Sequence, residues 1–219
     1  MRDGVVELAE TERALRRVDR KNFARSVDDP SPAGDKAAYQ DAPMPIGPLA
    51  TISAPHMHGR CLDLLAPPLL AKERKGLTSK VLDVGSGSGF LTAAFAVLGD
   101  RVLAYGVDRT EALVALSEAN VRRDAELFRD VGARVSFSRG DGWKGLPSRG
   151  PFDAIHVGAA AETIPDDLLD QLAVGGRMII PVGERHEAQA LVQVDKAEDG
   201  SLSSTTLFGV RYVELVKEV

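Results

Sequence analysis

The sequence predicts an α/β fold with a doubly wound, mostly parallel sheet, an antiparallel C-terminal edge and an N-terminal helical appendage. Three observations lead to this prediction. From about residue 56, short apolar segments alternate with segments of helical periodicity. A glycine-rich turn follows the first of these apolar segments. The last two apolar segments are separated by Asp199-Gly200, a pair typical of hairpin turns. Strands that alternate with helices are typical of parallel sheets.

The composition bounds the class of protein. The chain has 219 residues, of which 44% are hydrophobic and 27% charged, with a formal net charge of −5. A net acidic charge argues against a protein that binds nucleic acid mainly by electrostatics, and no apolar run approaches the length of a membrane span. The single cysteine, Cys61, cannot form an internal disulfide, which favours a reducing compartment. We therefore expect a cytoplasmic protein without nucleic-acid or membrane partners. As a separate expectation, we take it to be a monomer.

Residues 1–45 are expected to form an appendage of helix and loop, and residues 46–219 the main domain. Apolar residues recur at helical spacing over 5–24, which predicts one amphipathic helix or two short ones. The segment 26–41 contains Pro30, Pro32 and Gly34 and is predicted to be a loop. Prolines and a glycine continue the irregular chain to residue 48. The appendage has too few apolar residues for a core of its own.

The elements of the main domain follow from apolar runs and helical periodicity. A first helix is predicted over 57–71, where Pro67-Pro68 breaks or kinks it. The other helices are predicted over 90–98, 110–123 and 165–172. The strands are predicted over 80–84, 101–107, 135–138, 152–157, 177–181, 190–195 and 204–215.

The turn after the first strand reads Gly85-Ser-Gly-Ser-Gly89. Glycines let the backbone turn tightly and let a ligand approach without a Cβ in the way. The dinucleotide-binding fingerprint needs its third glycine where this chain has Phe90, and a phosphate-binding P-loop needs a Gly-Lys-Ser/Thr sequence that is absent. The turn alone is also compatible with a plain connection between strand and helix.

Two acidic positions strengthen the binding interpretation. Asp108 ends the second strand, where a carboxylate can accept hydrogen bonds from two ribose hydroxyls. Asp141-Gly142 follows the third strand, where a carboxylate can receive an adenine amino group. Alone, Asp108 could cap a helix and Asp141-Gly142 could form a turn. Asp83, the glycines, Asp108 and Asp141 all follow or end strands and are therefore expected at one edge of the sheet. Their order along this edge is the order in which a bound adenosine would meet them, with Asp108 at the ribose and Asp141 at the adenine.

This arrangement resembles that of class I S-adenosylmethionine-dependent methyltransferases, which implies a Rossmann-like sheet. Several further segments resemble the signature of the protein-L-isoaspartate(D-aspartate) O-methyltransferase family, and the resemblance runs from about residue 4 to residue 215. These segments are Ala50-Thr-Ile-Ser-Ala-Pro-His-Met-His58, the stretches 81–92, 152–161 and 171–183, Tyr39-Gln-Asp-Ala-Pro43, and Ile46-Gly47. The segment around Ser53 is foreign to most other class I enzymes.

The resemblance implies a repair enzyme that takes S-adenosyl-L-methionine as cofactor and releases S-adenosyl-L-homocysteine. Its partners would be isoaspartyl-containing peptides and unfolded or aged proteins, with D-aspartyl residues as further acceptors. An isoaspartyl carboxylate has a pKa of roughly 4 and is ionised at neutral pH, so its methylation needs no general base. The enzyme has to hold one carboxylate oxygen in line with the methyl group, in a site with little water.

The resemblance also assigns the site residues. Ser53 would be the catalytic residue, with its hydroxyl donating to the substrate carboxylate; by itself, Ser53 could equally cap the following helix. Substrate contacts map onto Ser53, His58, Tyr212 and Val213. Cofactor contacts map onto Ala50, Thr51, Ile52, Ser53, His58, Asp83, Gly85, Ser86, Gly87, Asp108, Asp141 and Gly142.

Other residues keep simpler interpretations. His56 and His58 lack further ligands at a suitable spacing, so we expect no metal site. His156 lies in an apolar strand and is expected to be a core histidine with a satisfied hydrogen bond. Trp143 either lines the adenine side or packs, and Tyr212 and Val213 could also be core residues of an edge strand. Two other functions remain open: a nicotinamide oxidoreductase, which Phe90 argues against, and a non-enzymatic adaptor.

Overall fold

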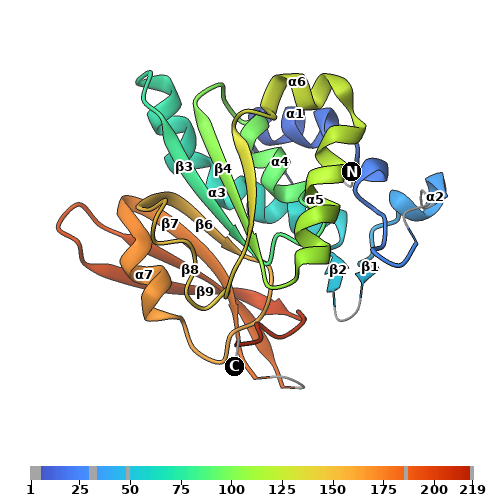
Figure 1. Ribbon diagram of the computed structural model, residues 1–219. Helices are drawn as coiled ribbons and strands as arrows, with labels where there is room; N and C mark the ends of the chain where they lie inside the picture. The colour runs from blue at the N-terminus through green and yellow to red at the C-terminus, as the bar shows by residue number, and fades with distance from the viewer. Residues whose placement is uncertain (1–5, 30–33, 48–49, 185–186, 218–219) are drawn as a thin grey trace.

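The computed structural model describes residues 6–29, 34–47, 50–184 and 187–217 (Figure 1). Its centre is a seven-stranded sheet in the order β5-β4-β3-β6-β7-β8-β9. The strands are β3 Ser79–Val84, β4 Val102–Asp108, β5 Val135–Arg139, β6 Phe152–Val157, β7 Leu172–Val182, β8 Gln189–Lys196 and β9 Leu202–Val210.

The strand pairing confirms the predicted fold class. The five strands β3 to β7 run parallel, and β8 pairs antiparallel with both β7 and β9. Because β3 has β4 on one side and β6 on the other, the chain reverses its direction of travel across the sheet at β3. A crevice at the carboxyl ends of the strands is the usual ligand site at such a switch point.

The last strand is shorter than predicted. It ends at Val210 rather than at residue 215, so the placement of Tyr212 and Val213 on this strand was wrong. The reason is that β8 begins at Gln189, which pairs with Val210, so the described part of β8 offers no partner to the residues after Val210. Instead, the Gln189 side chain bonds both backbone groups of Tyr212, and Glu214 forms an isolated bridge with Ala160.

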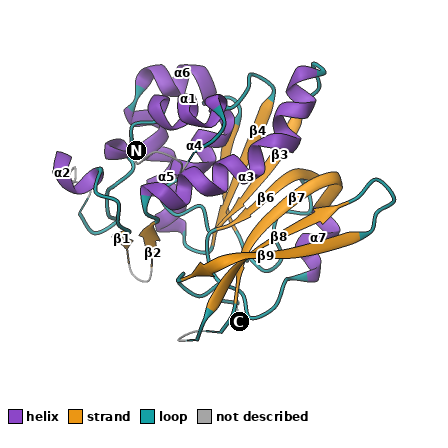
Figure 2. Cartoon of the chain, turned by 180° about the vertical axis from the view of Figure 1, so that it is seen from behind, coloured by secondary structure: helices purple, strands orange, loops and turns teal. Residues whose placement is uncertain are grey.

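Helices cover the two faces of the sheet unequally (Figures 1 and 2). One face packs against α1 Ala9–Arg17, α3 Pro55–Arg74, α4 Phe90–Val97, α5 Glu111–Arg123 and α6 Ala125–Val131, whereas α7 Asp166–Gln171 lies on the other. Side chains in the central strands alternate between these layers: Val81 and Ala154 join the helix-rich core, and Leu82 and Ile155 join the opposite one. Burial on both faces explains why these strands are continuous apolar runs.

Helix α3 is continuous through Pro67-Pro68, so the predicted break does not occur. A proline has no N–H, and Pro68 therefore leaves the carbonyl of Leu64 without its helical donor. Arg177 on β7 replaces that donor: its Nη1 lies 3.2 Å from the Leu64 carbonyl oxygen, and its Nε donates to Asp195 Oδ1 at 2.6 Å. The contact between β7 and α3 thus compensates for the helical hydrogen bond that Pro68 cannot donate.

The N-terminal segment is more structured than predicted. It contains α1, the 3₁₀ turn η1 Arg20–Asn22, the short helix α2 Asp35–Ala38 inside the predicted loop, and β1 Met44–Gly47. β1 forms a hairpin with β2 Ala50–Ile52, where we expected irregular chain, and α6 was also missed. Val18 and Phe23 belong to the main core, and the Phe23 ring meets Phe90 edge to face at 5.6 Å. The segment therefore shares the core of the main domain.

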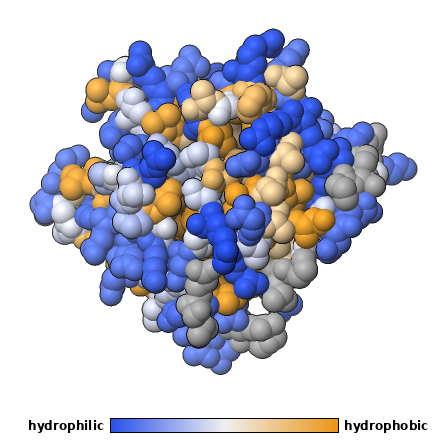
Figure 3. Space-filling model, in the orientation of Figure 1, coloured by the Kyte–Doolittle hydropathy of each residue, from blue (hydrophilic) through white to orange (hydrophobic). Residues whose placement is uncertain are grey.

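Hydrophilic residues dominate the face of the molecule seen in Figure 3. In the orientation of Figure 1, hydrophobic residues form several separate patches on a mostly hydrophilic face (Figure 3). Within the described ranges, no helix is long and apolar enough to cross a membrane.

Replacing Arg177 tests its role in compensating for Pro68. Arg177→Met removes both hydrogen bonds, and because these involve a charged donor we expect a loss of about 1–2 kcal/mol in the free energy of unfolding. Urea unfolding of both proteins measures the change. Arg122→Met is the control, because Arg122 pairs with Glu118 on an exposed helix face; equal losses in the two variants would contradict the interpretation.

Candidate functional site

The glycine turn between β3 and α4 depends on backbone conformations that favour glycine. Gly87 and Gly89 have φ values of +54° and +79°. A Cβ on Gly89 would also lie 2.8 Å from the Phe137 ring and 3.0 Å from Ser117 Cβ, which is too close for any other residue. Ser117 of α5 donates to the carbonyl of Gly87 at 2.9 Å and fixes the turn. The turn therefore lies close against α5 and β5.

Asp108 at the end of β4 faces this turn. Its Oδ2 accepts a hydrogen bond from the backbone N–H of Gly87 at 3.0 Å. Burial raises the pKa of Asp108, although backbone N–H groups, first that of Gly87, oppose this effect. Asp108 does not cap α5, because Thr110 is its N-cap and accepts from the N–H of Leu113. The helix-cap alternative for Asp108 is therefore wrong.

Asp141 and Gly142 follow β5 and have different surroundings. Asp141 Oδ1 accepts a hydrogen bond from the backbone N–H of Trp143 at 2.9 Å, so this segment does form the turn that its sequence favours. Gly142 lines the same cavity as Asp108. A Cβ at Gly142 would lie 2.8 Å from Leu215 and 2.9 Å from Val84. The chain can pass this point only because the residue is glycine.

Ser53 lies in the connection between β2 and α3. It is half-buried, and within the described part of the chain its hydroxyl makes no hydrogen bond to the protein. Ala54, not Ser53, is the N-cap of α3, and no side chain caps that helix. The capping alternative for Ser53 is therefore wrong, and its hydroxyl is available to a ligand.

Two adjoining cavities, which we call the crevice, bring most of the predicted site residues together. Among those residues, Asp141 and Tyr212 do not line it. The cavities hold about 80 and 30 Å³, whereas a small-molecule pocket usually measures roughly 300–1,000 Å³, so the walls must separate to admit a ligand. The predicted residues on the walls are Ala50, Thr51, Ile52, Ser53, His58, Asp83, Gly85, Ser86, Gly87, Asp108, Gly142 and Val213.

A buried ion pair lies at the floor of the crevice. His156 Nδ1 of β6 is 2.8 Å from Asp83 Oδ1 of β3, and Thr92 of α4 donates to the other Asp83 oxygen at 2.5 Å. Burial lowers the pKa of His156, but the bonds to Asp83 and to Cys61 outweigh burial and raise this pKa to about 10. His156 is therefore the core histidine that we expected, and it carries a positive charge.

The Tyr212 side chain points to Cys61, beside the buried pair of His156 and Asp83, rather than into the crevice. Burial raises the pKa of its hydroxyl, and its contact with Cys61 adds to this effect. Trp143 also packs: its Nε1 donates to the carbonyl of Leu215 at 2.7 Å, and Lys217 lies over its ring. Of the two interpretations of Trp143, packing is therefore the one observed.

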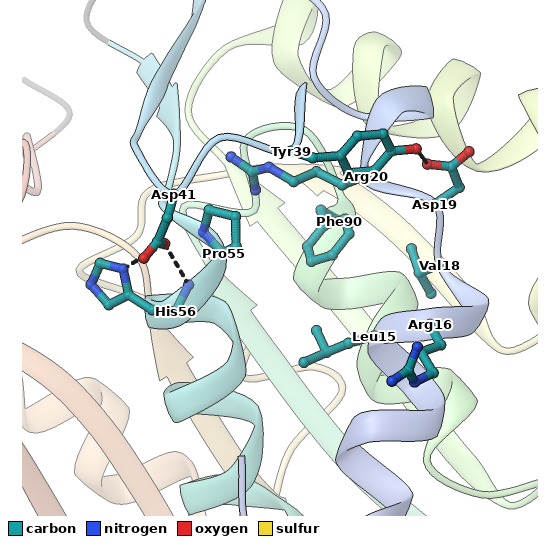
Figure 4. A pocket seen from close by; sticks show the side chains of 10 residues that line it. All are labelled: Leu15, Arg16, Val18, Asp19, Arg20, Tyr39, Asp41, Pro55, His56 and Phe90. Atoms are coloured by element: carbon teal, nitrogen blue, oxygen red, sulfur yellow. Dashed lines mark hydrogen bonds and ion pairs between the residues drawn. The ribbon is translucent and has the colours of Figure 1, made fainter. Parts of the chain in front are cut away.

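A larger cavity of about 850 Å³ lies between the N-terminal segment and the start of α3 (Figure 4). Arg20 and Phe90 line this cavity, and Phe90 also stacks on His58 from the crevice at 4.8 Å between ring centroids. Sequence analysis missed Arg20, because an arginine in a short charged segment gives no signal of burial. His56, on the same cavity, bonds Asp41 through its Nδ1 at 2.7 Å.

Comparisons with known proteins agree with one another. A family model described as protein-L-isoaspartate(D-aspartate) O-methyltransferase matches residues 1–219. A protein-L-isoaspartate O-methyltransferase of Triticum aestivum is 49% identical over 178 residues, covering 81% of this chain and 74% of that protein. Protein-L-isoaspartate O-methyltransferase 1 of Arabidopsis thaliana is 46% identical over 214 residues, covering 97% and 86%.

A solved structure is similar over almost the whole chain. It is that of a putative protein-L-isoaspartate O-methyltransferase from Plasmodium falciparum in complex with S-adenosyl-L-homocysteine. The two share 30% sequence identity and superpose with a TM-score of 0.82, covering 99% of this chain and 94% of that one.

The ion pair predicts a pH-dependent stability. Because the pKa of His156 in the folded protein is about 10 and its ordinary value is 6.5, the pair stabilises fully below pH 6.5 and loses its effect as the pH rises towards 10. We expect the difference in unfolding free energy between the parent protein and His156→Gln to shrink over this range, as measured by urea unfolding at several pH values.

The control is His56→Gln, which removes an exposed pair with Asp41 and should change stability by less than about 1 kcal/mol. A difference between His156→Gln and the parent protein that stays constant or grows from pH 6.5 to 10 would show that His156 is not held as a cation.

Proposed function

The chain belongs to the protein-L-isoaspartate(D-aspartate) O-methyltransferase family, and we propose that it transfers the methyl group of S-adenosyl-L-methionine to the free carboxyl group of L-isoaspartyl residues in damaged proteins and peptides. Its relatives in plants carry the name of this activity, and the similar Plasmodium falciparum structure contains the product form of this cofactor. The family description supports D-aspartyl residues as further acceptors.

One observation carries this proposal: Ser53 and the glycine turn line the same cavity. The glycine turn offers its backbone groups to a cofactor. The Ser53 hydroxyl beside it is a hydrogen-bond donor without a protein partner in the described chain. A chain that only bound a nucleotide would not need this donor. The Ser53 hydroxyl can hold a carboxylate, and it lies next to the part of the crevice where a methyl donor would bind.

The residues present fit the cofactor. Asp108 offers a fixed carboxylate to the ribose hydroxyls, and the glycine turn leaves its backbone open to the methionine part. Ser86, on the turn, has a buried hydroxyl without a hydrogen-bond partner in the described chain, which a bound ligand could satisfy. Gly142, on the crevice wall, would meet the adenine end, and we retain Asp141 beside it as a further adenine contact although its carboxylate accepts from Trp143 in this structure. When bound, the sulfonium supplies an electrophilic methyl group.

The contribution of the protein to the reaction is orientation. The acceptor carboxylate is already ionised near neutral pH, since its pKa is roughly 4, and no base is required. Ser53 donates a hydrogen bond to one carboxylate oxygen and so holds the other towards the methyl group. The narrow crevice limits water around these groups, which favours charge neutralisation between a sulfonium and a carboxylate.

The remaining assignments are also proposals. We retain Tyr212 and Val213 as the residues that meet the peptide; the place of Val213 on the crevice wall supports this, whereas the Tyr212 side chain points towards Cys61. A buried free Cys61 is in keeping with action in the cytoplasm, and we propose a monomer. We retain a division into an appendage of residues 1–45 and a methyltransferase domain of residues 46–219, and the described part of the appendage packs on that domain.

A pair of synthetic peptides tests the function. The two peptides differ only in that one carries L-isoaspartate where the other carries L-aspartate. With radiolabelled S-adenosyl-L-methionine, we expect base-labile labelling of the isoaspartyl peptide alone. Equal labelling of both peptides, or no labelling of either, would exclude the proposed activity.

Ser53→Ala removes the proposed donor to the substrate carboxylate. A hydrogen bond to a charged group contributes about 1.5–3 kcal/mol, so we expect kcat/KM for the isoaspartyl peptide to fall roughly 10- to 100-fold. Binding of S-adenosyl-L-homocysteine should survive. The control, Ser136→Ala, alters an exposed serine of β5 and should leave kcat/KM unchanged; an unchanged value for Ser53→Ala would remove Ser53 from the mechanism.

Asp108→Asn tests the ribose contact. The amide keeps the shape of the side chain but offers one acceptor oxygen without charge, so we expect the Kd for S-adenosyl-L-homocysteine to rise roughly 10-fold or more. Isothermal titration calorimetry measures this change. Asp100→Asn, at an exposed turn, provides the matched control, and equal affinities in the two variants would mean that Asp108 does not hold the cofactor.

A further inference from the structure

Arg20 of η1 reaches from the N-terminal segment to α3 through the core. The residue is only 5% exposed. Its Nη1 lies 3.2 Å from Nδ1 of His58, and its Nε donates to the carbonyl of Ala38 at 2.8 Å. Figure 4 shows its side chain beside Phe90, whose ring centroid is 5.9 Å from the guanidinium carbon. These contacts leave the guanidinium little freedom to move.

The chemistry of the two groups decides where the proton of His58 resides. A guanidinium has five N–H donors and no acceptor. Although burial lowers the pKa of Arg20 to about 10, the group is charged at neutral pH. Nδ1 of His58 must therefore accept the hydrogen bond and cannot carry a proton. A neutral imidazole with a bare Nδ1 carries its proton on Nε2.

The other neighbours of His58 also favour the neutral ring. Burial lowers its pKa well below the ordinary value, and the electrostatic effects of Arg20 on η1, His156 on β6 and His56 on α3 act in the same direction. The ring is held by Phe90 of α4, which stacks on it with 25° between the planes. His58 thus has one tautomer and one orientation.

The Nε2–H of His58 has no acceptor among the residues that the structure describes. His58 lines the part of the crevice formed by Ser53, Asp83 and the glycine turn. The protein therefore presents a fixed, neutral N–H donor where the methionine part of the cofactor is proposed to bind. The anionic group of that part is its carboxylate.

We propose that Arg20 is a positioning residue: it holds His58 as the neutral Nε2–H tautomer, and this N–H donates to the methionine carboxylate of the cofactor. The assignment of the ligand rests on the proposed function, whereas the tautomer does not. It gives the N-terminal segment a role in cofactor binding, although Arg20 itself does not touch the cofactor. Without Arg20, the proton of the neutral ring could occupy either nitrogen, and the Nε2–H donor would be present only part of the time.

Long-range ¹H–¹⁵N NMR spectra of the full-length protein with labelled histidine read the tautomer directly. The chain has four histidines, and the signal lost in His58→Gln identifies His58. We expect a neutral Nε2–H ring from pH 5.5 to 8.5 in the parent protein. In Arg20→Met we expect a mixture of the two neutral tautomers. A proton on Nδ1 in the parent protein, or an unchanged His58 signal in Arg20→Met, overturns the proposal.

Calorimetric titration with S-adenosyl-L-homocysteine then tests the consequence. Loss of a fixed donor to a carboxylate should raise the Kd about 10-fold in Arg20→Met. In a His58→Gln background the same change should have no further effect, because Arg20 acts through His58. Equal effects of Arg20→Met in both backgrounds indicate a merely structural role and overturn the proposal.

The matched control is Arg16→Met. Arg16 lines the same large cavity but is exposed and pairs with Glu12, so its replacement should leave the Kd unchanged. If Arg20→Met does not fold, Arg20→Lys takes its place. Lysine retains a donor and should preserve the Nε2–H tautomer of His58. Loss of this tautomer in Arg20→Lys would count against the proposal. Failure of the parent protein to bind S-adenosyl-L-homocysteine would instead overturn the proposed function.

Discussion

The buried ion pair between His156 and Asp83 is the interaction on which the site depends. It joins the two neighbouring strands β6 and β3 at their carboxyl ends, at the point where the strand order reverses. Asp83 also accepts a hydrogen bond from Thr92 on α4, and His156 also contacts Cys61 on α3. The glycine turn begins two residues after Asp83. Its position is therefore set by the Asp83 carboxylate of β3, which is bonded to β6 and α4, and by the contact of His156 with α3.

The crevice also depends on segments far from the sheet in the sequence. The hairpin β1-β2 brings Ser53 to the glycine turn, and the N-terminal segment fills the core behind His58 with Phe23 and Arg20. On the opposite wall, the chain after β9 returns to the crevice through the bridge between Ala160 and Glu214. The reaction needs no basic group, so the contribution of these segments is to place donors and exclude water.

The parts of the fold that were predicted correctly have local signals. Apolar runs predicted all the strands of the large sheet, and the glycine turn and Asp108 were predicted from their place at strand ends. The errors arise where tertiary contacts decide. Arg177 supports α3 through Pro67-Pro68, and the start of β8 at Gln189 ends β9. Arg20 of η1 holds the end of α2 through the Ala38 carbonyl, and Ile46 packs β1 into the main core. Arg20 could not be found, because its burial depends on a contact with α3.

The central claim is that Ser53, the glycine turn and Asp108 form one site for a methyl donor and an isoaspartyl carboxylate. A crystal structure with S-adenosyl-L-homocysteine and an isoaspartyl peptide tests it most directly. The account predicts the carboxylate within hydrogen-bond distance of Ser53 Oγ, the ribose hydroxyls on Asp108, and a carboxylate oxygen facing the sulfur. A peptide bound elsewhere, or a carboxylate turned away from Ser53 and the sulfur, would contradict it.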